Sequence, residues 1–175
     1  LAHARLAILD TSSAGTQPFT DASGRYTIIY NGEFYNYRDY YAELRADGVN
    51  FTSSSDTEVL LYLYIKYRQC CLEKINGFFA FAVYDSVENT LFVARDRMGI
   101  KPLYFIQTEQ FFGFSSELKG ILEFPFERKL NNNALFAYLQ FMYVPAPMTM
   151  VQGVEKLEPG MSLFVSSSGV ERNRY

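Results

Sequence analysis

Asn31, Gly32 and Glu33 are the residues whose types and spacing could most directly do chemistry in this sequence. They follow a run of aromatic and β-branched residues that begins at Tyr26, so they are expected at the end of a strand. An Asn side-chain amide beside a Gly backbone N–H offers two hydrogen-bond donors that can stabilise an oxyanion. A carboxylate next to them, such as Glu33, can hold a cationic amine.

The same dipeptide has a structural interpretation that needs no chemistry. Asn-Gly between apolar residues is the strongest short-range signal of a tight β-hairpin turn. Taken alone, Asn31-Gly32 favours that hairpin. The apolar residues between positions 37 and 44 recur at helical spacing, however, and this favours a strand that leads into a helix.

Two further polar residues stand beyond what a core requires, Arg5 in the first expected strand and Asp56 in the run Ser55-Asp56-Thr57-Glu58. Each has an ordinary explanation, because Arg5 could be a surface residue and Asp56 could favour the helix dipole. The run also matches a capping box that starts a helix. Together with the Asn-Gly-Glu motif, the two residues supply a carboxylate binder, two acids for an amine and an oxyanion site. Such a set could hold a free α-amino acid while its side-chain carbonyl is attacked.

Composition excludes several classes of protein. The 175 residues are 49% hydrophobic and 17% aromatic, which suffices for one well-cored domain or a large part of one. The net charge is −3 and no Lys/Arg cluster follows any element, so nucleic acid is not an expected partner. No apolar stretch approaches the roughly 20 residues that a membrane span requires. The start at Leu1 lacks a signal peptide and a start methionine, so the true N-terminus is expected further upstream.

The two cysteines, Cys70 and Cys71, are neighbours in the chain, where a disulfide between them would demand strained geometry. We interpret both as small buried hydrophobic residues. His3 is the single histidine, so no set of zinc ligands exists and no metal site is expected. Reduced cysteines and an acidic net charge favour a cytoplasmic protein.

The expected fold class is α+β, because meanders of strands alternate with grouped helices. Strands are expected over residues 1–9, 26–30, 77–84, 91–94, 103–106, 111–114 and 161–165, and helices over about 36–46, from 55, 117–122 and 133–141. The strands over 77–84 and 91–94 are expected to be joined as a hairpin through residues 85–89.

Several motifs carry a resemblance to one family. They are His3 to Asp10, Tyr30 to Asn36, Ser55 to Glu58, Phe78 to Asp85, Ala94 to Tyr104 and Phe114 to Lys119. In this order, they resemble the glutaminase domain of glutamine-dependent asparagine synthetase over essentially residues 1–175. The resemblance implies a class II glutamine amidotransferase with an N-terminal-nucleophile fold, in which two stacked antiparallel sheets lie between helix layers.

The resemblance also implies roles for individual residues. Arg5 would bind the α-carboxylate of L-glutamine, and the Ile8-Leu9 backbone would line the substrate pocket. Glu33 and Asp56 would take the α-ammonium group, while the Asn31 side chain and the Gly32 N–H would form the oxyanion hole. The loop from Arg95-Asp96 to Pro102 would mainly brace the site from behind.

In that family a cysteine at the first position attacks the glutamine side-chain amide, with its own α-amine as base. The nucleophile is not in this sequence, because the family pattern places it a few tens of residues before Leu1. The resemblance further implies a downstream synthetase domain that binds ATP and Mg²⁺ and receives the ammonia. The resemblance leaves open whether the protein forms a homodimer.

Two interpretations remain at this point. The first is the glutaminase part of an asparagine synthetase, or of a related amidotransferase with another acceptor, that is incomplete at both ends and inactive alone. The second is a non-catalytic glutamine-sensing or interaction domain of the same fold. The first is favoured because all the polar residues assigned to glutamine binding and to the oxyanion hole are present.

Overall fold

The structure, a computed structural model, describes residues 1–3 and 16–175. Its strands are β1 (Phe19–Thr20), β2 (Tyr26–Phe34), β3 (Gly77–Asp85), β4 (Thr90–Arg95), β5 (Tyr104–Gln107), β6 (Phe112–Ser115), β7 (Val154–Lys156), β8 (Met161–Ser166) and β9 (Gly169–Arg174). Its helices are α1 (Tyr37–Ala46), α2 (Asp56–Tyr67), α3 (Leu118–Ile121) and α4 (Asn132–Phe141), with a 3₁₀ segment η2 (Arg68–Glu73) after α2.

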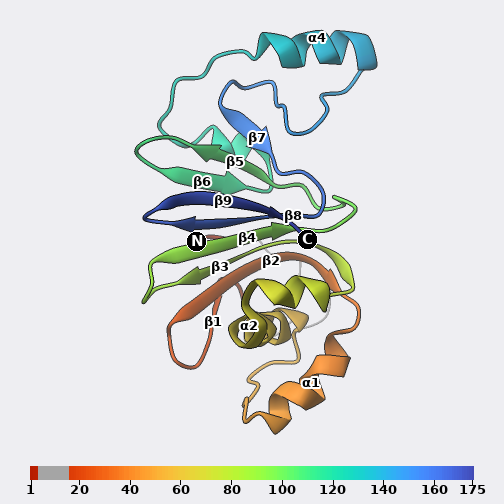
Figure 1. The fold of residues 1–175 in the computed structure, drawn as a ribbon, viewed down its shortest axis with the longest axis vertical. Coiled ribbons are helices and arrows are strands. Elements are labelled where there is room, and N and C mark those ends of the chain that lie inside the picture. The colour runs from red at the N-terminus through yellow and green to blue at the C-terminus, as the bar shows by residue number, and fades with distance from the viewer. Residues whose placement is uncertain (4–15) are drawn as a thin grey trace.

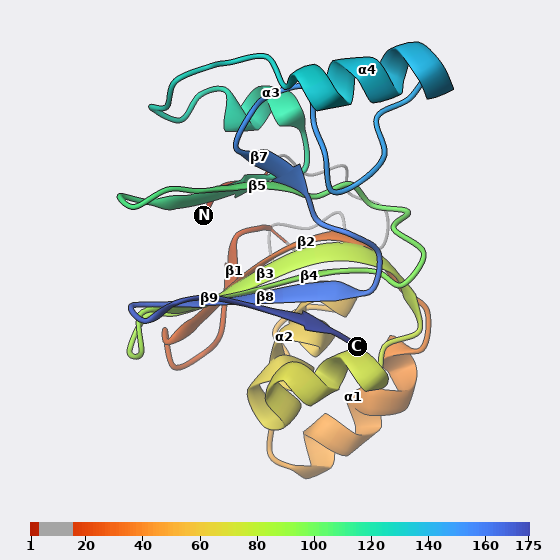
Figure 2. The same cartoon turned by 45° about the horizontal axis from the view of Figure 1, so that its top comes forward.

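The strands form two antiparallel sheets that are stacked between helices. The larger sheet has the order β1-β2-β3-β4-β8-β9, and the smaller has the order β6-β5-β7. Helices α1 and α2 cover the outer face of the larger sheet, whereas α3 and α4 lie beyond the smaller sheet (Figure 1, Figure 2). The expected α+β class with two sheets between helix layers is therefore confirmed.

Alternation along β3 divides the core into two sides. Phe79, Phe81 and Val83 join the cluster that contains residues of α1 and α2. Ala80 and Ala82, between them, join the cluster shared with the smaller sheet. Large aromatic side chains thus fill the space between sheet and helices, and small ones face the other sheet.

Most of the expected elements are present, but β2 differs in length. It continues to Phe34 and pairs with β3 through every residue, so Asn31-Gly32 lies inside a strand. The hairpin expected through residues 85–89 is confirmed, with Asp85 as the last residue of β3 and opposite Thr90 of β4. Residues 4–9 of the first expected strand lie outside the described residues, and residues 1–3 are not in a strand. Strands β1, β7 and β9 were not expected.

Helix α2 starts as the sequence predicts, although the capping box is incomplete. The Ser55 side chain accepts a hydrogen bond from the Thr57 N–H at 3.2 Å. Glu58 binds the preceding loop instead, since its carboxylate accepts from both the N–H and the hydroxyl of Thr52 and of Ser53. Among the described residues, no helix is long and apolar enough to span a membrane.

Candidate active site

The motif Asn31-Gly32-Glu33 lies in β2 against the beginning of β3. Asn31 is opposite Ala80, Gly32 is opposite Phe79, and Glu33 is opposite Phe78. The hairpin interpretation of Asn31-Gly32 is wrong, because nine consecutive pairings with β3 hold this stretch extended. A propensity for a turn in two residues is weak beside such a ladder.

The direction of the backbone N–H groups of β2 follows from their partners. In an antiparallel ladder, these groups point alternately toward one neighbour and the other. The Tyr30 N–H is bound by Gln17 at 2.6 Å and the Phe34 N–H by the Asp56 carboxylate at 3.2 Å, both on the side away from β3. Gly32 lies midway between them, so its N–H points to the same side.

The backbone of Phe79 supports this assignment. Its N–H donates to the Asp96 carboxylate at 3.3 Å, and its carbonyl accepts from the Asp96 N–H at 2.8 Å. Both groups of Phe79 therefore face away from β2, and its opposite residue Gly32 forms a non-hydrogen-bonded pair with it. The Gly32 N–H therefore points away from β3, to the side of β2 that β1 pairs with, at a position past the end of β1.

Gly32 and Gly77 allow an unusually close approach of β2 and β3. A Cβ atom on Gly32 would lie 2.2 Å from the carbonyl oxygen of Phe78, and one on Gly77 would lie 2.1 Å from that of Glu33. Real Cβ atoms do not approach so closely, and the obstructing atoms belong to backbone. Both glycines are thus required for the observed path of the motif.

Asp56 is the first residue of α2 and is 6% exposed. Its carboxylate accepts the Phe34 N–H, two residues beyond Gly32 in β2. This hydrogen bond joins the helix start directly to the strand that carries the Asn-Gly-Glu motif. The structure therefore brings Asn31, Gly32, Glu33 and Asp56 into one region, as the sequence analysis expected.

The electrostatics of this region favour a cationic ligand. Burial raises the pKa of Asp56, and the charge of Glu33 raises it further, while the Phe34 N–H opposes the shift. Tyr30 beneath them has a raised pKa, because it is buried and faces the charge of Asp56. Its hydroxyl has no hydrogen-bond partner within the described part of the chain. An ammonium group at this position would stabilise the ionised Asp56 carboxylate, which burial and the neighbouring charge of Glu33 disfavour.

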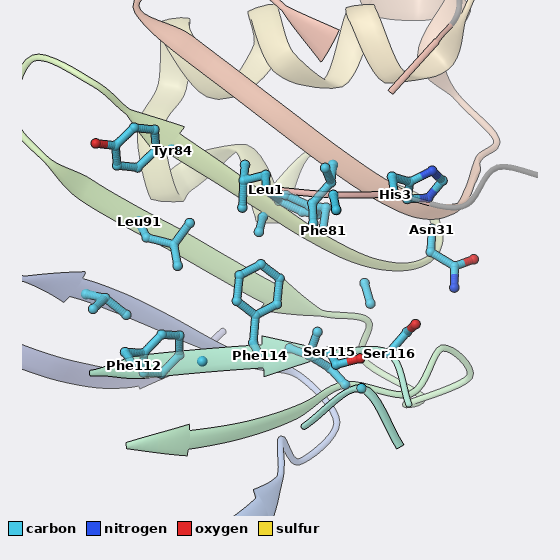
Figure 3. Close-up of a pocket in the computed structure, with 18 of the residues that line it drawn as sticks. Leu1, His3, Asn31, Phe81, Tyr84, Leu91, Phe112, Phe114, Ser115 and Ser116 are labelled. Atoms are coloured by element: carbon cyan, nitrogen blue, oxygen red, sulfur yellow. The ribbon is translucent and has the colours of Figure 1, made fainter. Parts of the chain in front are cut away.

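A large cavity lies between the two sheets and opens beside Asn31 (Figure 3). Its volume is about 1250 Å³. The larger sheet contributes Ile29, Ala80 and Ala82, and β6 contributes Phe112 and Phe114. Figure 3 shows the Asn31 amide directed into this space, toward the segment with Ser115 and Ser116.

The loop after β4 braces the motif through β3, which agrees with the role that its sequence suggested. The buried Asp96 carboxylate accepts the N–H groups of Met98, Ile100 and Lys101 at 3.0 Å each, in addition to that of Phe79. Arg95 donates to the carbonyl oxygens of Lys101, Gly99 and Leu157. One rigid loop thus holds the residue that is opposite Gly32.

The structure describes only some of the other residues that the sequence analysis singled out. Arg5, Ile8 and Leu9 are outside the described residues. Cys71 is buried as expected, and burial raises its pKa, but Cys70 is exposed, so that half of the interpretation is wrong. The described residues contain no cluster of His, Cys, Asp or Glu that could hold a metal. Gln17 was not singled out from the sequence, since a Gln before a Pro carries no chemical signal by itself.

A comparison with protein families decides how this geometry is to be understood. The model of the glutamine amidotransferase domain matches residues 1–175. The chain belongs to the class II glutamine amidotransferase family. It is 41% identical to asparagine synthetase 3 (glutamine-hydrolysing) of Bacillus subtilis over 177 residues, which cover 99% of the chain and 29% of that relative. Asparagine synthetase 1 (glutamine-hydrolysing) of the same organism is 38% identical, over 94% of the chain and 26% of that relative.

The glutamine amidotransferase domain described here is thus homologous to the glutaminase domains of asparagine synthetases, and it spans under a third of those two relatives. Amidase chry2 of Gibberella zeae is also 37% identical, over 94% of the chain and 24% of that relative. A solved structure, the glutamine phosphoribosylpyrophosphate amidotransferase of B. subtilis, has a TM-score of 0.64 at 24% identity and covers 98% of the chain and 34% of that structure. This last likeness shows the N-terminal-nucleophile fold.

Proposed function

We propose that this domain releases ammonia from L-glutamine for an asparagine synthetase, in which ATP and Mg²⁺ act in a separate synthetase region that amidates aspartate. The observation that carries the proposal is the Gly32 N–H, which the ladder directs off β2 between two N–H groups that Gln17 and Asp56 already occupy. Gly32 follows directly on Asn31, which lines the cavity.

In this function the Asn31 side chain and the Gly32 N–H donate to the oxygen that becomes negative when the glutamine amide is attacked. Both donors are held by a strand, so little reorganisation is needed as charge develops. Asp56 and Glu33 hold the α-ammonium group of glutamine. Arg5 is assigned to its α-carboxylate, and the backbone of Ile8 and Leu9 to the pocket wall.

The nucleophile belongs to a part of the polypeptide that precedes these residues in the family pattern. Its cysteine thiolate adds to the amide carbon, ammonia departs with the proton that the α-amine returns, and water hydrolyses the thioester to glutamate. Neither Cys70 nor Cys71 is assigned this role, because both lie in η2 after α2, where Cys71 is buried in the core cluster with α1 and α2, and neither lines the cavity beside Asn31. The released ammonia passes to the synthetase region as its partner.

The test uses the complete polypeptide that carries this domain. Asn31→Ala should lower the kcat of glutamine hydrolysis by about 10²–10³, the usual loss for one oxyanion-hole donor. Its KM for glutamine should change much less, because the donor acts mainly once charge develops. Synthesis of asparagine from aspartate, ATP and free ammonia should continue at the parent rate.

Asn89→Ala is a matched control, because Asn89 lines the same cavity near the opposite end of β3 and binds the Tyr84 hydroxyl. It should leave glutamine kinetics unchanged. A loss in Asn31→Ala that appears wholly in KM, or an equal loss in both variants, would overturn the oxyanion assignment. A complete polypeptide that binds glutamine without hydrolysing it would support the glutamine-sensing alternative instead. A cytoplasmic location and a homodimer stay predictions.

A further inference from the structure

Gln17 is a buried polar residue, 9% exposed, whose side-chain amide makes three hydrogen bonds. Its oxygen accepts the Tyr30 N–H at 2.6 Å. Its nitrogen donates to the Tyr30 carbonyl oxygen at 3.1 Å and to the Thr57 hydroxyl at 3.3 Å. A single side chain therefore contacts the residue before Asn31 and the residue after Asp56.

The position of Gln17 continues the pairing of β1 with β2. Phe19 is opposite Ile28 and Thr20 is opposite Thr27, so the same register places residue 17 opposite Tyr30. In an antiparallel ladder, such a pair exchanges two backbone hydrogen bonds. Here the side-chain amide of Gln17 makes both of them with Tyr30, in place of its backbone.

The side-chain amide of Gln17 therefore binds the edge of β2 close to the oxyanion donors. Within the described residues, the backbone pairing of β1 with β2 reaches Phe19 and Ile28, and the Gln17 side-chain amide continues it to Tyr30. Gln17 thus satisfies the buried N–H and C=O of Tyr30, two residues before Gly32. On the other side of Gly32, Asp56 takes the Phe34 N–H.

The bond to Thr57 connects the same amide to α2. Thr57 follows Asp56 in the first turn of the helix, and both residues are buried. The distance between the β2 edge and the α2 start is therefore set at two points, Gln17 to Thr57 and Phe34 to Asp56. These two points flank the place where the oxyanion donors and the ammonium-binding carboxylate must face one ligand.

We infer that Gln17 is a positioning residue for the glutamine site, which sets the oxyanion strand and the ammonium-binding helix start relative to each other. The inference rests on the proposed glutaminase function. Gln17 itself contacts no reacting atom in this scheme. Its effect on rate arises because a displacement of about 1 Å in such a site can cost on the order of 10² in rate.

The test compares variants of the complete polypeptide at a temperature where each is folded. Gln17→Ala removes all three bonds, and we expect glutamine kcat/KM to fall about 10²-fold, through both a lower kcat and a higher KM. Thr57→Val removes only the bond to the helix, and it should raise KM while kcat stays within about twofold. Thr57→Ser keeps the hydroxyl and should restore the parent KM. Ammonia-dependent synthesis should be unchanged in all of them.

Thr20→Val is the matched control, because it removes the Thr20–Thr27 hydroxyl contact of 3.0 Å, which also joins β1 to β2 but lies away from the motif. It should keep the parent glutamine kinetics. If Gln17 served stability alone, folded Gln17→Ala would behave like Thr20→Val, and this result would overturn the inference. If Gln17→Ala fails to fold, the comparison of Thr57→Val with Thr57→Ser decides, and equal KM values in that pair would refute the link to α2. The parent polypeptide in the same assay separates the two proposals: no glutamate release from glutamine would remove the glutaminase function and this inference with it, whereas an active parent with unaffected Gln17→Ala kinetics overturns this inference alone.

Discussion

Gly77→Ala should impair glutamine hydrolysis although Gly77 contacts no substrate in the proposed mechanism. A Cβ at this position would lie 2.1 Å from the Glu33 carbonyl oxygen and 3.3 Å from the Phe34 Cα. Ordinary contact begins at 3.4 Å, so the first distance is short by 3.4 − 2.1 = 1.3 Å. Since the obstructing atoms are backbone, β2 must move by about this amount, and it carries Glu33 and Phe34 with it.

Two effects follow from that displacement. Overpacking of this kind costs about 1–3 kcal/mol of stability. A shift of about 1 Å in the site costs on the order of 10² in rate. We therefore expect kcat/KM for glutamine to fall about 100-fold in Gly77→Ala, with ammonia-dependent synthesis retained. The measurement is steady-state glutamate release, together with a thermal unfolding curve for each protein.

Gly153→Ala separates a loss of stability from a loss of geometry. Gly153 has φ +81° and no atom within 4 Å of the added Cβ, so its cost is left-handed backbone strain of about 1–2 kcal/mol. The control should lose similar stability and keep the parent glutamine kinetics. If Gly77→Ala retains those kinetics as well, the close approach of β2 and β3 does not position the site, and the reasoning fails.

Two predictions concern buried carboxylates. Burial raises the folded pKa of Asp56, so the protonated carboxyl contributes stability at low pH, and this contribution is lost as pH rises through that pKa. Asp56→Asn should therefore gain stability relative to the parent as pH rises. Glutamine at 100 times its Kd should stabilise the parent by about 2.7 kcal/mol and the variant hardly at all, and equal stabilisation in a thermal shift assay would contradict the ammonium assignment. The hydrogen bonds from Arg25 lower the pKa of Asp85 to about 2, so the stability they supply is present above the unfolded value near 4 and is lost as pH falls toward 2. Asp85→Asn should be destabilised in urea at pH 7 and match the parent near pH 2, and a pH-independent difference would refute the ion-pair explanation.

The sequence predicted the elements that have a strong local signal. The Ser55 cap, the β3–β4 hairpin and the helix α1 are all in place, because capping chemistry and apolar spacing act over a few residues. Strand β9 was missed because half of its sequence, Gly169–Arg174, is charged and it shows no apolar alternation. Pairing with β8 makes it a strand, and this information is not local.

The candidate site, too, was predicted where the signal is local and missed where it depends on distant residues. Asn31, Gly32, Glu33 and Asp56 could be chosen for their chemistry and through a family resemblance. The direction of the Gly32 N–H could not, because it depends on the partners of Tyr30, Phe34 and Phe79, which lie 13 to 22 residues away in the chain. Gln17 was missed for the same reason, since its role depends on its position opposite Tyr30.

The edges of the two sheets differ in how they receive another strand. Within the described residues, β9 forms one edge of the larger sheet and carries Glu171, Arg172 and Arg174, charges that discourage edge-to-edge association. Strand β6 forms an edge of the smaller sheet, and its sequence Phe-Gly-Phe-Ser has no charge. It also borders the cavity that opens beside Asn31. The β9 edge of the larger sheet is thus protected by charge, whereas the uncharged β6 edge of the smaller sheet is better suited to β-augmentation, on the side where the cavity lies.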